Sequence, residues 1–102
     1  MKFLIVTCIK ESRKDVFTLF KQANIKVFSM SDVIGIKDYQ QHNLLEDWFA
    51  SGDEQFDSQM IFSFTPEENA KKAMELINQY NEKNETGFPL RGFVLPVEAF
   101  SK

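Results

Sequence analysis

The sequence predicts an α+β sandwich in which a four-stranded antiparallel sheet carries two helices on one face. Two observations predict this fold: short apolar runs alternate with helical stripes, and they follow the order strand, helix, strand, strand, helix, strand. The chain has 102 residues, of which 43% are hydrophobic and 14% aromatic, and this composition excludes an intrinsically disordered protein. We therefore expect one domain over residues 1–102.

The first strand and helix have clear signals. Residues 3–9 form a nearly continuous apolar run that is typical of a buried strand. Ser12 is the expected N-cap of the helix that follows, and Asn24 is its expected end. The apolar stripe of this helix consists of Val16, Leu19, Phe20 and Ala23.

Two further strands follow, and a long connection separates them. Residues 25–36 predict the second strand, with a bulge near residues 32–33 where the alternation changes phase. Residues 58–65 predict the third strand. One face of the third strand carries Met60, Phe62 and Phe64.

The second helix and the last strand complete the pattern. Thr65 is the expected N-cap, and Pro66 is expected at the first helical position. The apolar face of the helix consists of Ala70, Ala73, Met74, Ile77 and Tyr80. Residues 90–97 then predict a strand, and Pro96 near its end favours an edge position.

The order βαββαβ gives a ferredoxin-like sandwich, because right-handed crossovers place both helices on the same face of the sheet. The other face then has no helix to cover it. The first and last strands nevertheless carry apolar residues at nearly every position, so both of their faces are expected to be buried. The free sheet face should therefore pack against other subunits of a closed homo-oligomer.

The connection over residues 37–57 is too long for an ordinary hairpin loop. It contains the only Trp and several other large apolar residues, so it is not a low-complexity linker. One interpretation is that these side chains pack on the same subunit or on a neighbour. The other is a recognition loop in which Trp48 and Phe49 anchor a partner protein.

Charge and composition argue against several kinds of partner and site. The net charge of −3 argues against nucleic acid as the main partner, and no apolar run is long enough for a membrane helix. The single cysteine, Cys8, excludes an internal disulfide and a zinc site of clustered thiolates. The apolar run before Cys8 is too short for a signal peptide, so we expect a cytoplasmic protein without direct membrane insertion.

Three segments resemble the PII/CutA superfamily, whose members are ferredoxin-like homotrimers. Residues 2–23 match in length and pattern. The segment Asp47-Trp48-Phe49-Ala50-Ser51-Gly52-Asp53-Glu54 is similar to the CutA hairpin, in which a Trp-rich turn carries acidic residues. The segment Phe88-Pro89-Leu90-Arg91-Gly92-Phe93-Val94-Leu95-Pro96-Val97 is similar to the last strand of CutA and of small PII-like proteins.

The resemblance implies a non-enzymatic PII-like regulatory protein that binds a small effector between subunits. The implied cleft is bounded by Gly35 and Lys37 on one side and by Thr86, Gly87 and Arg91 on the other. The two cations beside glycine backbone suit an anionic ligand such as a nucleotide. The implied partner of the 37–57 loop is a protein such as a membrane transporter.

One departure limits this inference. The Gly-Asp-Gly-Lys loop of classical PII proteins is missing, because Thr86-Gly87 leads directly into Phe88-Pro89. The resemblance therefore implies a divergent PII-like protein with another small effector or none, rather than a classical sensor of ATP and 2-oxoglutarate.

Two alternatives to the regulatory function remain open. A CutA-like metal-binding or metal-tolerance protein would use His42 and Glu46, whose i, i+4 spacing suits a divalent metal if this stretch is helical. A small ferredoxin-like enzyme would enclose a substrate cavity at the sheet. We expect no enzyme and assign no catalytic residue, because the sequence contains no acid–base pair at fixed spacing and no nucleophile motif.

Overall fold

The computed structural model describes residues 1–36, 55–84 and 87–101. The elements are, in chain order, β1 (Lys2–Ile9), the 3-10 helix η1 (Lys10–Ser12), α1 (Arg13–Gln22), β2 (Ser29–Ile36), β3 (Gln55–Thr65), α3 (Glu67–Lys83) and β4 (Arg91–Pro96). This order confirms the predicted ferredoxin-like α+β fold.

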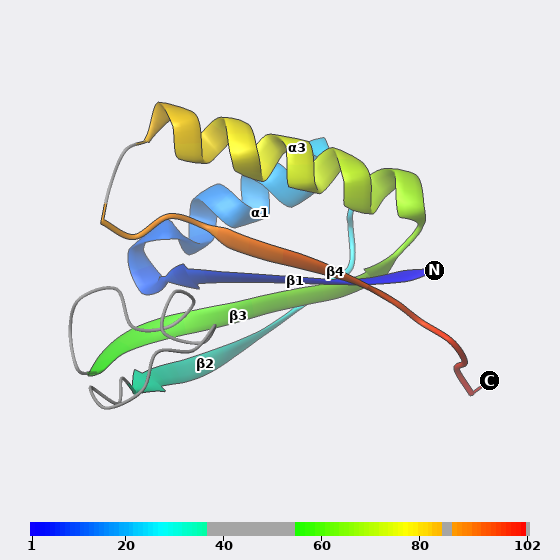
Figure 1. Cartoon of the computed structure of the whole chain (residues 1–102), viewed down its shortest axis with the longest axis horizontal. Helices are drawn as coiled ribbons and strands as arrows, with labels where there is room; N and C mark the ends of the chain where they lie inside the picture. The colour runs from blue at the N-terminus through cyan, green and yellow to red at the C-terminus, as the bar shows by residue number, and fades with distance from the viewer. Residues whose placement is uncertain (37–54, 85–86, 102) are drawn as a thin grey trace.

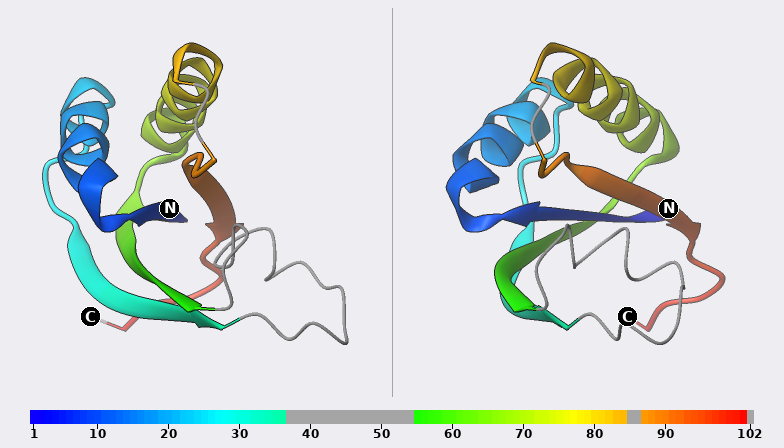
Figure 2. Two further views of the ribbon diagram at one scale, coloured as in Figure 1. Left: turned by 90° about the vertical axis from the view of Figure 1, so that its left-hand side faces the viewer. Right: turned by 60° about the vertical axis from the view of Figure 1, so that its left-hand side comes forward.

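The four strands form one antiparallel sheet in the order β2-β3-β1-β4. Both helices cover the same face of this sheet (Figures 1 and 2). The hydrophobic core lies between the helices and the sheet, where burial of apolar side chains supplies the main stabilisation. Its largest fully buried apolar side chains are Leu4, Val6, Val16, Phe20, Ile61, Ile77 and Leu90.

The end of α1 confirms Asn24 as the residue that stops the helix. Asn24 adopts a left-handed conformation with φ of 62°. Its backbone N–H donates to the Lys21 carbonyl at 3.1 Å, and the Ile25 N–H donates to the Phe20 carbonyl at 2.8 Å. These two bonds form a Schellman motif, which satisfies carbonyls that a helix end otherwise leaves unpaired.

Of the two predicted N-caps, the position of Ser12 is confirmed and that of Thr65 is wrong. Ser12 occupies the N-cap position of α1 without a side-chain cap hydrogen bond, because η1 runs directly into the helix and gives Ser12 helical dihedrals. Pro66, rather than Thr65, is the N-cap of α3. Thr65 still belongs to β3, where it pairs with Lys2 and is buried.

The strand boundaries and the predicted bulge also need correction. β2 begins at Ser29 rather than at residue 25, and β3 begins at Gln55, three residues before the predicted start. The register between β2 and β3 runs without interruption, so there is no bulge near residues 32–33. Asp32 pairs with Gln59 in this register, and its carboxylate accepts a hydrogen bond from the Gln59 side-chain amide at 2.8 Å.

The sheet face opposite the helices is apolar and aromatic. We call it the open sheet face and define it by the side chains that alternate with the core positions: Phe3, Ile5, Met60, Phe62, Phe64, Phe93 and Leu95. The ring of Phe3 stacks on Phe64 with centroids 4.7 Å apart and meets the edge of Phe62 at 5.8 Å. The predicted shared face of Met60, Phe62 and Phe64 is therefore confirmed by the register.

Burial of the two sheet faces is unequal within one chain. Phe64 is 61% exposed and Leu95 is 45% exposed, although both are large and apolar. β4 is an edge strand, as Pro96 suggested, and none of its residues is fully buried. Burial of both faces of β4, as the sequence predicts, would therefore require contact with another copy of the chain.

Close packing of α3 on β4 depends on Gly92. A Cβ atom at Gly92 would lie 2.8 Å from Ile77 Cδ1 and 3.0 Å from Met74 Sδ. We expect Gly92→Val to lower the free energy of unfolding by about 1–3 kcal/mol, because the added side chain overpacks this contact. Urea unfolding measures the change. Gly87→Val is the matched control, since a Cβ there meets no atom within 4 Å. Equal stability of the two variants would contradict this account.

Candidate functional site

The topology brings the two halves of the predicted effector site to the same end of the sheet but to opposite edges. Gly35 lies near the C-terminal end of β2, and Arg91 is the first residue of β4. Because β3 and β1 lie between these strands, the two residues are separated by three strand spacings, or about 14 Å or more. One chain does not close a small-ligand site between them.

The β4 side of the site is open and carries one positive charge. Arg91 is exposed and forms no ion pair with any residue in the described part of the chain. Gly87 precedes it in the connection from α3 and has open space where a side chain would stand. Backbone at Gly87 can therefore approach a ligand closely, and the Arg91 guanidinium can donate charge-assisted hydrogen bonds to an anion.

The structure adds Thr7, which the sequence analysis did not single out. Thr7 pairs directly with Arg91 across β1 and β4, so both side chains lie on the open sheet face. Thr7 is 1% exposed, and its Oγ1 has no hydrogen-bond partner among the described residues. The available signal was a hydroxyl residue inside the otherwise apolar run of residues 3–9.

A second buried polar residue lies on the helix side of the sheet. Gln59 is 1% exposed and donates through Nε2 to Asp32, while its Oε1 accepts no hydrogen bond from the described residues. Near Asp32, a cavity of about 220 Å³ is lined by Lys10, Asp32, Val33, Ile34 and Ser58. This cavity lies at the β2 edge and is therefore remote from Arg91 at the β4 edge.

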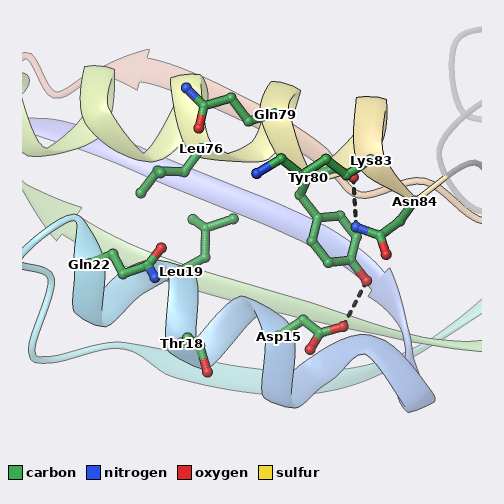
Figure 3. Close-up of a pocket in the computed structure, with 9 residues that line it drawn as sticks. All are labelled: Asp15, Thr18, Leu19, Gln22, Leu76, Gln79, Tyr80, Lys83 and Asn84. Atoms are coloured by element: carbon green, nitrogen blue, oxygen red, sulfur yellow. Dashed lines mark hydrogen bonds between the residues drawn. The ribbon is translucent and has the colours of Figure 1, made fainter.

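A groove of about 260 Å³ separates the exposed sides of α1 and α3 (Figure 3). The Tyr80 hydroxyl from α3 donates a 2.7 Å hydrogen bond to the Asp15 carboxylate from α1 and so links the two helices. This hydrogen bond is the largest cause of the raised pKa of Tyr80, because it stabilises the protonated phenol. Tyr80 is therefore a hydrogen-bond donor here rather than a base, and none of the effector residues that the structure describes, Gly35, Gly87 and Arg91, lines the groove.

Cys8 has the environment of a structural thiol. It is 5% exposed within the core, and burial together with the negative charge of Asp15 raises the pKa of its thiol to about 11. The protonated thiol is a poor nucleophile and a poor metal ligand at neutral pH. Cys8 therefore packs as a small buried apolar residue.

Several predicted residues lie outside the described part of the chain. They are Lys37 and Thr86 of the effector site, Trp48 and Phe49 of the partner site, and His42 and Glu46 of the alternative metal site. Within residues 1–36, 55–84 and 87–101, no group of three or more His, Cys, Asp or Glu side chains could hold a metal ion. The same residues include no helix long and apolar enough to cross a membrane.

Solved structures show which fold this arrangement belongs to. A PII-like signaling protein of Thermus thermophilus superposes with a TM-score of 0.63 over 91% of this chain and 82% of its own, at 11% identity. The protein CPII of Thiomonas intermedia was solved with ADP, AMP and acetate. It gives the same TM-score over 92% of this chain and 82% of its own, at 19% identity. The chain therefore has the fold of PII-like signaling proteins, as its sequence motifs predicted. No family model and no curated protein sequence matches it.

The raised pKa of Cys8 predicts a loss of stability at alkaline pH. In the unfolded chain the thiol loses its proton near pH 9, whereas in the folded chain it keeps the proton up to about 11. Because the folded state then binds more protons, the free energy of unfolding falls as the pH rises through this window, by roughly 1–3 kcal/mol in total. Urea unfolding between pH 7 and 11 measures this fall.

Other groups, such as Tyr80, also lose protons at alkaline pH. Comparing the wild type with Cys8→Ala isolates the contribution of the Cys8 thiol to the change in stability. The stability advantage of the wild type over the variant should shrink as the pH rises, because the variant lacks the titrating thiol. Parallel stability curves for the two proteins across this range would contradict the assignment.

Proposed function

We propose that this chain is a non-enzymatic, cytoplasmic PII-like regulatory protein. It forms a homotrimer, binds a small anionic effector in clefts between subunits, and contacts a partner protein through residues 37–57. The fold and its likeness to PII-like signaling proteins support the regulatory class. In this proposal, residues 1–102 form one domain that has no catalytic residue.

The observation that carries the proposal is the division of the candidate site between opposite sheet edges. Gly35 on β2 and Arg91 on β4 are too far apart to hold one small ligand within a chain. A closed ring places the β2 edge of one copy near the β4 edge of the next, so two copies can complete each cleft. The exposed apolar open sheet face supplies a reason for copies to associate.

Adenine nucleotides are the effectors that we propose to test first. CPII, which shares the fold, was solved with ADP and AMP. In this chain, Arg91 and Lys37 would supply positive charge, and Gly35, Thr86 and Gly87 would supply backbone for close approach. The missing Gly-Asp-Gly-Lys loop favours a recognition mode different from that of classical PII proteins.

The proposed partner is a protein such as a membrane transporter. Trp48 and Phe49 are the anchors in this proposal, since large aromatic residues dominate many binding interfaces. An effector bound at Lys37 would touch the base of the 37–57 segment and so bias its conformation.

Calorimetric titration tests the effector site. The wild-type protein should bind ADP or AMP, and Arg91→Ala should weaken binding about 10- to 100-fold, because a charge-assisted hydrogen bond to phosphate is lost. Lys71→Ala is the charge-matched control, since Lys71 is exposed on α3 and lies away from the site. Absence of binding heat with ADP, AMP, ATP and cyclic nucleotides would contradict the nucleotide proposal.

The double variant Trp48→Ala/Phe49→Ala tests the partner loop. We expect it to keep the melting temperature and native mass of the wild type but to lose capture of a transporter from a detergent-solubilised membrane fraction, because its anchors are gone. Phe100→Ala is the control, since Phe100 is a 70% exposed aromatic residue outside the loop. If the double variant melts early or dissociates, Trp48 and Phe49 are packing residues and the proposed partner contact is wrong.

A further inference from the structure

Thr7 is a polar residue whose burial requires an explanation. It is 1% exposed on a strand whose other described side chains on the open sheet face are apolar, and its Oγ1 has no partner among the described residues. Buried hydroxyl groups are usually hydrogen-bonded, because an unsatisfied one opposes folding. A Val of the same shape would avoid this penalty.

The position of Thr7 associates it with the candidate effector site. Thr7 pairs with Arg91 on β4 and with Met60 on β3. The Cβ atoms of directly paired residues are about 4.5–5.5 Å apart, so a phosphate bound over the open sheet face beside Arg91 can reach the Thr7 hydroxyl as well. The flanking side chains of Arg91 and Met60 are long and flexible, and Arg91 is exposed, so they can move aside for a ligand.

We infer that the Thr7 hydroxyl donates a hydrogen bond to the phosphate of the effector that Arg91 binds. The ligand class is a phosphate-bearing nucleotide such as AMP or ADP, whose oxygens accept hydrogen bonds from both groups. Thr7 thereby selects for phosphate, and the bound ligand satisfies a hydroxyl that the free protein leaves unpartnered. This inference depends on the proposed effector site and assigns it a residue outside the set that the sequence predicted.

Thr7→Val tests this contact because it removes the hydroxyl and keeps the side-chain shape. The free variant should melt about 2–6 °C above the wild type, because an unsatisfied buried group is removed. Its affinity for ADP and AMP should fall at least about fivefold, whereas any binding of adenosine, which lacks phosphate, should not change. Calorimetry and thermal unfolding give the two readouts.

Thr7→Ser is the matched control, since it keeps the hydroxyl and should bind ADP within about twofold of the wild type. Unchanged ADP affinity of Thr7→Val overturns the inference and leaves the effector site standing. A change in native mass with unchanged ADP affinity would place the hydroxyl in a contact between copies and would also overturn it. If the wild type binds no nucleotide, the effector proposal fails and this inference fails with it.

Discussion

The aromatic face of the sheet that neither helix covers constrains the rest of this molecule. Both helices lie on one side of the sheet (Figure 2). On the other side, the rings of Phe3, Phe62 and Phe64 pack on one another, and neither helix covers them. Each 100 Å² of such surface that becomes covered contributes about 2.5 kcal/mol. Association with further copies of the chain is the simplest way to gain that energy, and a closed ring would cover the face of every copy.

The same architecture is the reason for proposing that the site lies between copies of the chain. In the sheet order β2-β3-β1-β4, the strand that leads into the long connection and the strand that follows the second helix lie at opposite edges. The β4 edge carries Arg91 and Gly87, whereas Gly35 lies on the β2 edge, so one chain does not bring the predicted residues together. A buried hydroxyl at Thr7 and an exposed guanidinium at Arg91 stand on adjacent strands at one of these edges.

The sequence predicted the fold well because its signals were local. Apolar runs and helical stripes identified the strands and helices, and Asn24 marked the end of α1 through its tolerance of positive φ. Details that depend on tertiary contacts were missed. The unbulged path of β2 is set by its pairing with β3, and Pro66 is the N-cap of α3 because Thr65 stays in the sheet. Thr7 was missed because strand register places it beside Arg91, and spacing along the chain does not reveal that register.

Sedimentation equilibrium of the full chain at micromolar concentration tests the central claim most directly. The account predicts a mass three times the 11.9 kDa of one chain. It also predicts that Phe64→Glu, which places a charge on the open sheet face, shifts the mass toward that of one chain, while Val27→Glu does not, although Val27 is 84% exposed. A wild-type mass of 11.9 kDa would contradict the account, because the open sheet face would then be stable in water without a partner copy.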